Sequence, residues 1–302
     1  MSTHATQLSR DVAQERAATL IDTLPWLTRY RGAVVVVKFG GNAMVSEDLT
    51  AAFAEDIAYL HHVGLHPAVV HGGGPQISRA LAEAGIHSEF RGGYRVTTPE
   101  AMNVVRQVLR DEVNSAIVDS LNVHGDLAIG LSGEDAALFT GATRTTVIDG
   151  QAVDLGRVGD IAAVDPSVVQ SAIDAGRIPV VSSIAPEDGD LSRPLNVNAD
   201  AAAGALAAAM TASKLIVLTD VAGLYSDWPD TSSLVTSITA DELRVLMPKL
   251  EAGMIPKMEA CLTAIDGGVD AASIIDGRVH HSILLELFTG PGVGTEVVKE
   301  TR

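Results

Sequence analysis

The sequence predicts an α/β protein: a three-layer αβα sandwich whose open central sheet is mostly parallel, preceded by an N-terminal helix. Short β-branched and aliphatic runs alternate along the chain with longer segments of helical period, which is typical of a parallel sheet covered on both faces. Several runs, such as the four valines 34–37, lack an alternating polar face, as expected of strands buried on both sides. Glycine-rich segments follow some of these runs, and ligands of such sheets bind beyond the carboxyl ends of the strands.

Composition limits the class of protein. The chain has 302 residues, of which 47% are hydrophobic, so it can bury a sizeable core and is not expected to be disordered. Its formal net charge of −17 argues against a nucleic-acid partner. Cys261 is the single cysteine, which excludes an internal disulfide and fits a cytoplasmic location. We see no signal-peptide core and no apolar run near the roughly 18 residues that span a bilayer, so we expect no membrane partner.

The N-terminal segment precedes the first core strand. Residues 4–24 predict a helix that Pro25 ends. The helix carries an irregular apolar stripe, formed by Val12, Ala17, Leu20, Ile21 and Leu24. Exposed apolar stripes often mark partner surfaces, so we expect this appendage to mediate self-association.

In the first half of the chain, strands and helices are expected in turn. A helix over 47–62 has Ser46 as N-cap, acidic residues in its first turn and Gly64 as its stop. Another opens at Thr98-Pro99, with one apolar face. The remaining predicted elements are strands 34–38, 67–71, 127–131 and 178–184 and a helix over 75–85.

Later segments continue this alternation, with one change of period. Residues 146–164 alternate as strands do and predict a hairpin that turns at Asp149-Gly150. Thr239 and Glu242 have capping-box spacing and predict a helix start. The other predictions are helices 200–212 and 256–265, a strand over 215–219 and a last core strand over 272–275.

Two predicted strands end in glycine-rich turns that suit an anion. The first ends in Lys38, followed by Gly40-Gly41, and the second in Gly72-Gly73-Gly74 with Pro75 behind it. A proline at the first helical position leaves the free amides of that turn facing the glycines, which makes an anion site. A tight strand-to-helix turn would use the same residues, but the parallel lysine and glycines favour a ligand site.

Further polar residues fall at the same predicted edge. Arg95 lies in a glycine-bearing loop and could hold a carboxylate through two hydrogen bonds. Residues 196–200 place Asn196, Asn198 and Asp200 before an apolar helix, and capping needs only one of them, so the others are candidates for binding. Lys257 opens a helix against its macrodipole, which a purely structural role would not favour.

Several known signatures are missing from the sequence. It contains no G-x-x-x-x-G-K-[ST] segment and no G-x-G-x-x-G segment that opens a helix after the first strand. The strand over 214–219 runs into a polar turn that suits a nucleotide. We expect Cys261 to be a core residue rather than a nucleophile.

In this order, the motifs resemble the amino acid kinase family. The resemblance covers residues 34–295 and rests on Lys38-Phe39-Gly40-Gly41, His71-Gly72-Gly73-Gly74-Pro75, Gly93-Tyr94-Arg95-Val96-Thr97, Asn196-Val197-Asn198-Ala199-Asp200, Leu218-Thr219-Asp220-Val221-Ala222-Gly223-Leu224 and Gly253-Met254-Ile255-Pro256-Lys257. It is strongest for the branch that uses ATP to phosphorylate the γ-carboxylate of N-acetyl-L-glutamate in arginine biosynthesis. The implied cofactors are ATP and Mg²⁺, with no metal held by the chain's own residues.

The resemblance also assigns roles to residues. Lys38 and Lys257 would stabilise the transferring phosphoryl group, and Asp200 would hold both lysines. Acetylglutamate would bind at Gly40, Gly41, Gly73, Gly74, Arg95, Asn196 and Asn198. The nucleotide would bind at Thr219, Asp220, Val221, Gly223 and Leu224. Since a carboxylate nucleophile is already ionised at neutral pH, no general base is needed, and none is apparent among the motifs.

Two segments resemble the arginine-inhibited, hexameric branch of the family: the N-terminal helix with residues 24–32, and residues 281–295. The implied arginine site comprises Lys214, His281, Glu286 and Gly292, and the implied assembly is a homo-hexamer, a trimer of dimers. We expect residues 1–31 to serve oligomerisation, 32–205 to bind acetylglutamate and 206–302 to bind ATP. The alternatives are another acid or carbamate kinase of the same fold, such as an aspartokinase, and a non-catalytic arginine-binding regulator.

Overall fold

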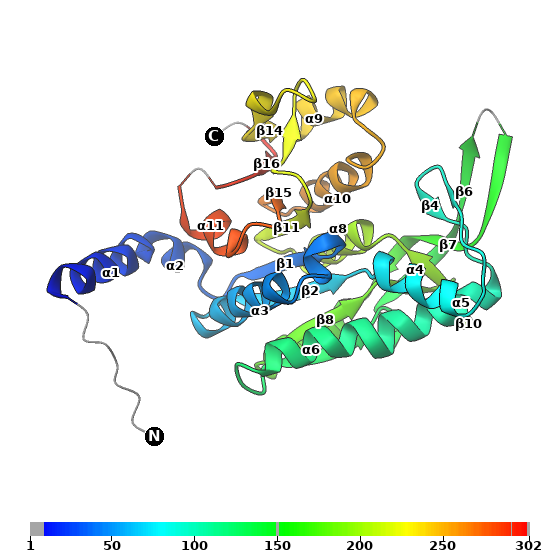
Figure 1. Cartoon of the computed structure of the whole chain (residues 1–302), viewed down its shortest axis with the longest axis horizontal. Helices are drawn as coiled ribbons and strands as arrows, with labels where there is room; N and C mark the ends of the chain where they lie inside the picture. The colour runs from blue at the N-terminus through cyan, green and yellow to red at the C-terminus, as the bar shows by residue number, and fades with distance from the viewer. Residues whose placement is uncertain (1–8, 149–150, 291, 301–302) are drawn as a thin grey trace.

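The computed structural model describes residues 9–148, 151–290 and 292–300. Its centre is a sheet in the strand order β14-β16-β15-β11-β1-β2-β8-β5 (Figure 1). These strands are β1 (Val34–Phe39), β2 (His66–His71), β5 (Ala128–Ser132), β8 (Ile178–Ser182), β11 (Lys214–Thr219), β14 (Ser237–Thr239), β15 (Ala271–Asp276) and β16 (Thr295–Val298). All described neighbours pair in parallel except β15 and β16, so the predicted mostly parallel sheet is confirmed.

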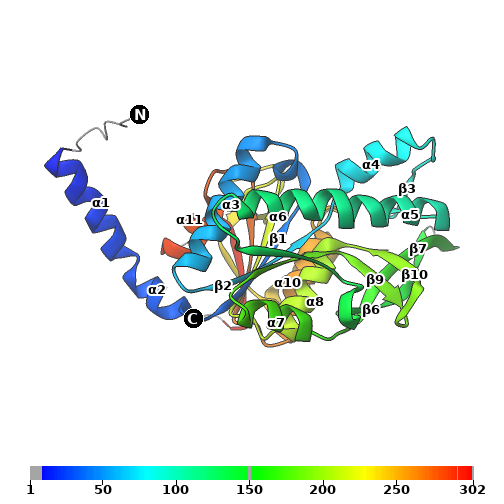
Figure 2. The same cartoon turned by 90° about the horizontal axis from the view of Figure 1, so that it is seen from below.

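Helices cover both faces of this sheet (Figure 2). Alternate residues of β1 point into two separate cores: Val35 and Val37 into one, Val36 into the other. The first core includes residues from α2 (Leu24–Tyr30), α3 (Glu47–His62), α4 (Gly74–Glu83), α5 (Pro99–Gln107), α6 (Asn114–Asn122) and α11 (Ser282–Phe288). The second includes residues from α7 (Ser167–Asp174), α8 (Ala199–Ala209), α9 (Ala240–Leu246) and α10 (Ile255–Asp266). The predicted three-layer sandwich is therefore confirmed.

Helix boundaries follow the local signals closely. Ser46 caps α3 by accepting a hydrogen bond from the backbone N–H of Leu49 at 3.4 Å. Thr239 and Glu242 form the predicted capping box of α9. One feature of the helices was not predicted: between α5 and α6 the chain continues as η2 (Val108–Val113), a π-helical segment.

The prediction that Pro25 ends the N-terminal helix is wrong. Helix α1 (Arg10–Asp22) ends earlier, and Pro25 lies in the first turn of α2. A first helical turn has no partner for its amide groups, so proline costs nothing there and starts a helix as readily as it ends one. The two helices also differ in packing, because α1 buries no residue whereas Tyr30 of α2 is 4% exposed within the core.

A second β unit lies outside the main sheet, and the sequence predicted only one hairpin of it. Strands β6 (Phe139–Ile148), β7 (Gln151–Val164), β9 (Ile184–Glu187) and β10 (Asp190–Val197) form a small closed barrel. The predicted hairpin is confirmed by the antiparallel pairing of β6 with β7, while its turn at Asp149-Gly150 lies outside the described residues. The strand predicted over 178–184 is confirmed as β8 but ends too late: after Ser182 the chain leaves the main sheet and enters the barrel as β9.

The C-terminal part contains two more sheet strands than expected: β16 adds to the edge of β15, and β14 pairs with β16. Short elements complete the fold: hairpins β3/β4 (Phe90–Arg91, Tyr94–Arg95) and β12/β13 (Leu224–Tyr225, Leu234–Val235), and helical turns η1 (Gly41–Met44), η3 (Asp135–Ala137), η4 (Thr231–Ser233) and η5 (Met247–Lys249). None of the helices within the described residues is long and apolar enough to span a membrane.

The two expected lobes are halves of one continuous sheet. Strands β1 and β11 join them by parallel pairing, and the expected boundary between residues 205 and 206 lies inside α8. The carboxyl ends of β1, β2, β8, β11 and β15 meet along one edge of this sheet, and the loops that follow them form the candidate site.

Candidate active site

Two lysines and one aspartate form a buried charged cluster at this edge. The Nζ atom of Lys38, at the end of β1, lies 2.9 Å from Oδ1 of Asp200. The Nζ atom of Lys257, in α10, lies 3.2 Å from Oδ2 of the same carboxylate. Asp200 is 4% exposed and Lys38 8%. The structure thus brings together three residues that are far apart in sequence, on the two oxygens of one carboxylate.

Local structure explains why these side chains meet. Asp200 lies in the first turn of α8, where the helix dipole favours a negative charge. The Oδ1 atom of Asn198 accepts hydrogen bonds from the N–H of Asp200 at 2.7 Å and of Ala201 at 3.3 Å, so Asn198 is the helix cap. Lys257 lies in the first turn of α10, an unfavourable place for a cation, and its ion pair with Asp200 compensates for this.

The cluster keeps Asp200 ionised. Burial alone would raise the pKa of this carboxyl group, but the charges of Lys38 and Lys257 outweigh burial and hold the pKa below its ordinary value. Asp200 therefore serves as a fixed negative charge between two ammonium groups. Gly40 leaves room for this arrangement, because a Cβ atom there would lie 2.9 Å from the Nζ of Lys38.

A cavity of about 220 Å³ adjoins the cluster on the side of β2. Ala199, the residue before Asp200, is part of its wall. The other lining residues are Gly72, Gly73, Gly74, Ile77, Phe90, Gly93, Tyr94, Arg95, Leu109, Val158, Ser183, Asn196, Val197 and Asn198. Of the residues expected to bind acetylglutamate, this cavity contains all except Gly40 and Gly41.

Arg95 is the cationic residue of this cavity. Its guanidinium is buried and donates to neutral acceptors only: the Oγ of Ser88, the Oγ of Ser78 at 2.7 Å and the carbonyl of Gly74 at 3.2 Å. Burial lowers the pKa of Arg95, although it stays charged in a protein. Within the described part of the chain, no carboxylate lies within 4.0 Å of it. A buried cation without a counter-charge, facing a cavity, is suited to an anionic ligand.

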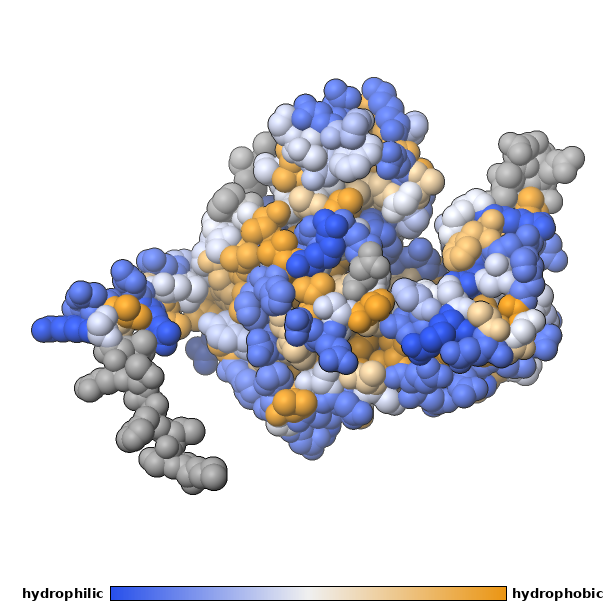
Figure 3. Space-filling model, viewed as in Figure 1, coloured by the Kyte–Doolittle hydropathy of each residue, from blue (hydrophilic) through white to orange (hydrophobic). Residues whose placement is uncertain are grey.

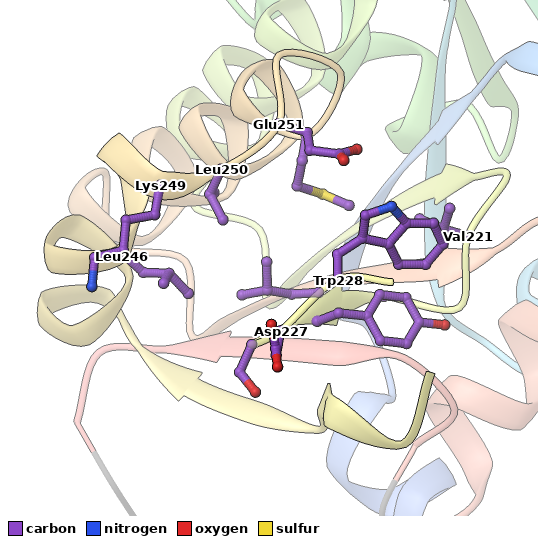
Figure 4. Close-up of a pocket in the computed structure, with 12 residues that line it drawn as sticks. Val221, Asp227, Trp228, Leu246, Lys249, Leu250 and Glu251 are labelled. Atoms are coloured by element: carbon purple, nitrogen blue, oxygen red, sulfur yellow. The ribbon is translucent and has the colours of Figure 1, made fainter. Parts of the chain in front are cut away.

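A second cavity, of about 360 Å³, lies on the other side, beside β12 and the start of α10 (Figure 4). Aromatic Trp228 and Tyr225 contribute to one wall, with ring centroids 5.2 Å apart. Figure 4 shows Leu246, Lys249, Leu250 and Glu251 across from Trp228. The complete lining is Val221, Gly223, Leu224, Tyr225, Ser226, Asp227, Trp228, Leu246, Lys249, Leu250, Glu251 and Met254.

The expected nucleotide residues divide between two places. Val221, Gly223 and Leu224 line the second cavity, whereas Thr219 and Asp220 are not in its wall. Asp220 instead faces the glycine turn after β1, where a Cβ atom at Gly41 would lie 3.3 Å from its Oδ1. The sequence reasoning missed the contribution of residues 225–254, although an aromatic pair in a polar turn is a signal that could have indicated it.

The charged cluster connects the two cavities through neighbouring residues in the chain. Ala199 lines the first cavity and Asp200 follows it directly. Met254 lines the second, and Lys257 lies three residues later, within the same helical turn of α10. Residues next to Asp200 and near Lys257 in the chain therefore line two different cavities.

A separate buried cluster contains three of the four residues expected to bind arginine. The Nζ of Lys214 lies 2.8 Å from Oε1 of Glu286 and 3.0 Å from Oε1 of Glu296. Gly292 packs so close that a Cβ atom would lie 2.5 Å from Oε2 of Glu286. His281 is placed elsewhere: its Nδ1 lies 2.7 Å from Oδ1 of Asp56 in α3.

The described side chains do not form a metal site. Among the side chains that the structure describes, no group of three or more His, Cys, Asp and Glu could hold a metal ion. Both oxygens of Asp200 are engaged by lysines.

Comparison with known proteins agrees with this fold. The model of the amino acid kinase family matches residues 33–276. Because the match covers most of the chain, the chain belongs to the amino acid kinase family.

Individual relatives narrow this further. An acetylglutamate kinase from Leifsonia xyli subsp. xyli is 64% identical over 288 residues, covering 95% of each chain. An acetylglutamate kinase from Clavibacter michiganensis subsp. michiganensis is 63% identical, covering 95% of this chain and 94% of the relative. These identities and coverages place the chain among the acetylglutamate kinases of the family.

One solved structure shows how widely the fold is used. N-acetylglutamate synthase from Neisseria gonorrhoeae, complexed with coenzyme A and N-acetyl-glutamate, has a TM-score of 0.81 and 25% identity. The match covers 95% of this chain and 64% of the length of the synthase.

Proposed function

We propose that this chain transfers the γ-phosphoryl group of ATP to the γ-carboxylate of N-acetyl-L-glutamate, a step of arginine biosynthesis. A carboxylate oxygen forms a bond to the γ-phosphorus, the bond between that phosphorus and the β–γ bridging oxygen breaks, and ADP leaves with the electron pair. No proton has to move, because the carboxylate is ionised at neutral pH. The observation that carries the proposal is the pair of lysines held by one buried carboxylate between two cavities.

The lysines supply what phosphoryl transfer requires. Charge is distributed over the oxygens of the transferring group and develops on the leaving oxygen, so catalysis depends on positioning and on fixed positive charge. Lys38 and Lys257 are held on opposite oxygens of Asp200, which places two ammonium groups near one point. Asp200 acts as a positioning residue, since its carboxylate touches the lysines rather than the substrate.

Acetylglutamate fits the first cavity. If its γ-carboxylate faces the lysines, its other carboxylate lies deeper, where Arg95 offers the only buried cationic side chain of the described lining. The guanidinium has five N–H donors, of which three are used by Ser78, Ser88 and Gly74, leaving two for a ligand. Asn196, whose Nδ2 lies 3.4 Å from the Oγ1 of Thr97, offers a further amide on the same wall.

ATP fits the second cavity. The aromatic faces of Trp228 and Tyr225 and the apolar side chains opposite them suit a purine ring. Lys249 adds a cation to the wall. Since the described residues offer no group of carboxylates for a metal, we assign Mg²⁺ to the phosphates, as part of the nucleotide substrate, where it neutralises phosphate charge.

A hydroxamate assay with ATP and Mg²⁺ over several acids tests this proposal. Hydroxylamine traps an acyl phosphate, so the expected result is a turnover that strongly prefers N-acetylglutamate over aspartate, glutamate and carbamate. Equal or higher turnover with one of the other acids would contradict the substrate assignment and favour another acid kinase of this fold. A chain that binds arginine without phosphorylating any acid would be a regulator instead.

We also propose that arginine inhibits the enzyme and that the N-terminal helices build a homo-hexamer. The buried Lys214–Glu286 pair supports an arginine site, because Glu286 could exchange Lys214 for a guanidinium. Burial lowers the pKa of Lys214, but Glu286 and Glu296 outweigh burial and raise it, and Tyr30 of α2 is also near enough to contribute, so the base of the N-terminal arm is close to this pair. A cytoplasmic location is consistent with the single, buried Cys261.

The N-terminal arm is the surface proposed for assembly. Helix α1 projects from the body (Figure 1), and apolar residues appear among the hydrophilic ones on the arm and on the adjoining surface (Figure 3). Leu20, Ile21 and Leu24 are 63%, 67% and 55% exposed. Such a row on an isolated helix is suited to a second copy of the same helix.

Deletion of residues 1–22 is expected to reduce the oligomer and weaken inhibition by arginine. The truncation removes α1 but leaves Tyr30 in the core, so the fold should persist. Light scattering gives the mass, and the hydroxamate assay at increasing arginine gives the inhibition. An unchanged hexamer, or an unchanged arginine response in a smaller oligomer, would contradict the corresponding part of the proposal.

A further inference from the structure

His71 is a buried residue that the proposed mechanism does not use. It ends β2 in the middle of the sheet, paired with Phe39 of β1 and Ser182 of β8, and it is 0% exposed. Burial lowers its pKa to about 4, so its imidazole is neutral at physiological pH. The glycine turn that lines the first cavity begins at the next residue.

The hydrogen bonds of His71 define its tautomer. Its Nδ1 lies 3.0 Å from the carbonyl oxygen of Gly72, which can only accept, so Nδ1 carries the proton and donates. Its Nε2 lies 3.0 Å from Nδ2 of Asn114, and in the neutral ring Nε2 accepts this bond. Each ring nitrogen thus has one partner and one role.

The bond to Gly72 determines the direction of the following amide. In a trans peptide the C=O and N–H groups point in opposite directions. Because the Gly72 carbonyl is turned toward the imidazole, the N–H of Gly73 points away from it, and Gly73 lines the cavity. Among the bonds that connect the described residues, none uses the N–H of Gly73, so this donor is available to a ligand.

Residues in η2, and the residue that follows it, contact His71 and Gly73. Asn114 is the first residue of α6 after η2, and its two side-chain N–H groups are shared among His71 and the carbonyls of Val180 at 2.8 Å and Leu131 at 3.2 Å, so its amide is anchored to β8 and β5. From η2 itself, Leu109 and Val113 press on Gly73: a Cβ atom there would lie 2.9 Å and 3.2 Å from their methyl groups. The wider π turn aligns all three side chains toward the glycine turn.

We infer that His71, through its bond to the Gly72 carbonyl, is a positioning residue that keeps the N–H of Gly73 directed at an anionic oxygen of the bound acid or its transferring phosphoryl group. The inference rests on the proposed function for the identity of that acid. The imidazole neither touches the substrate nor exchanges a proton. It fixes one peptide plane, and the peptide donates to charge that develops during transfer.

Two substitutions separate this role from a structural one. In His71→Asn the amide nitrogen can take the place of Nδ1 and still donate to Gly72, but the acceptor for Asn114 is lost. In His71→Gln the amide oxygen can take the place of Nε2 and accept from Asn114, but the donor to Gly72 is lost. Positioning therefore predicts that the glutamine variant loses activity and the asparagine variant loses stability.

The test measures kcat and KM with the acid that gives the highest turnover in the hydroxamate assay, together with the midpoint temperature of thermal unfolding. We expect His71→Gln to lower kcat by about ten- to a hundredfold with KM changed less than threefold, and to unfold near the wild-type temperature. We expect His71→Asn to retain kcat within threefold and to unfold at a lower temperature. A glutamine variant within threefold of wild-type kcat, or an asparagine variant that loses as much, would overturn the inference.

Crystal structures of the two variants separate this test from the substrate assignment. The expected result is a rotated Gly72–Gly73 peptide in the glutamine variant and an unchanged peptide in the asparagine variant, whichever acid is phosphorylated. An unchanged peptide in both would refute the positioning role while leaving the proposed function intact. A rotated peptide in an enzyme that does not phosphorylate acetylglutamate would refute only the assignment of that substrate.

Discussion

Replacement of Lys38 by alanine is expected to lower kcat by about 10²- to 10³-fold, with a much smaller change in KM for acetylglutamate. The ammonium group is nearly excluded from water, and its charge counts most when the phosphoryl group carries its developing charge. Under the proposed function, the acid makes its ground-state contacts elsewhere in the first cavity, at Arg95 and the glycine turn. Initial rates in the hydroxamate assay give kcat and KM separately.

Lys299→Ala is the matched control for this prediction, because Lys299 is exposed near the C-terminus, remote in sequence from every residue of the site. It should leave both constants within twofold. Lys257→Ala should resemble Lys38→Ala. A Lys38→Ala variant that retains more than a tenth of wild-type kcat would remove this lysine from the mechanism.

Replacement of Asp200 by asparagine is expected to cost stability as well as activity. Asparagine has nearly the same shape but leaves two largely buried ammonium groups without their counter-charge, and removal of one member of a buried pair costs about 3 kcal/mol. The lysines should also separate, so kcat should fall by about 10²-fold or more. Urea unfolding and the hydroxamate assay measure the two effects.

The stability difference depends on pH in a direction that the pKa of Asp200 fixes. The folded-state pKa lies below its ordinary value, so the ionised carboxylate stabilises the folded protein at pH values above the unfolded pKa of about 3.9. That contribution is lost as the pH falls through the lower, folded-state pKa. The difference in the free energy of unfolding between wild type and Asp200→Asn should thus be at its maximum at pH 7 and decrease below about pH 4.

Asp270→Asn, at an exposed aspartate before β15, controls for the loss of one negative charge from a chain of net charge −17. It should change the free energy of unfolding by less than about 0.5 kcal/mol. An Asp200→Asn protein as stable as this control at pH 7 would show that the lysines do not depend on the carboxylate.

Local patterns in the sequence were enough to predict the sheet and its edge. The valines before Lys38 and the aliphatic run before Thr219 predicted two buried strands, which the structure pairs directly. Capping signals predicted where α3 and α9 begin. These features depend on residues within a few positions of one another, which a single sequence displays.

Features that depend on distant contacts were not predictable in the same way. Only Ser182-Ser183 separate the apolar residues of β8 from those of β9, and a pair of serines does not tell that the chain moves from the main sheet to the barrel. The extra residue of the π turn in η2 shifts the helical phase only after Val108. Similarly, a proline such as Pro25 can mark either the start or the end of a helix, and the sequence does not tell which.

The site shows the same division. Lys38, Asp200 and Lys257 were named as separate motifs, and the resemblance to a family joined them before any geometry was known. The distances of 2.9 Å and 3.2 Å to one carboxylate depend on the packing of α8 against both α10 and β1. The role of His71 became visible only with its bonds to Gly72 and Asn114.

The central claim is that Lys38 and Lys257 act together on one phosphoryl group through Asp200, and a double-mutant cycle on kcat tests it most directly. Because loss of either lysine leaves Asp200 free to draw the other away from the phosphoryl group, the Lys38→Ala/Lys257→Ala protein should lose at least tenfold less activity than the product of the two single losses. A double loss equal to that product would mean that the lysines act independently, and would contradict the account.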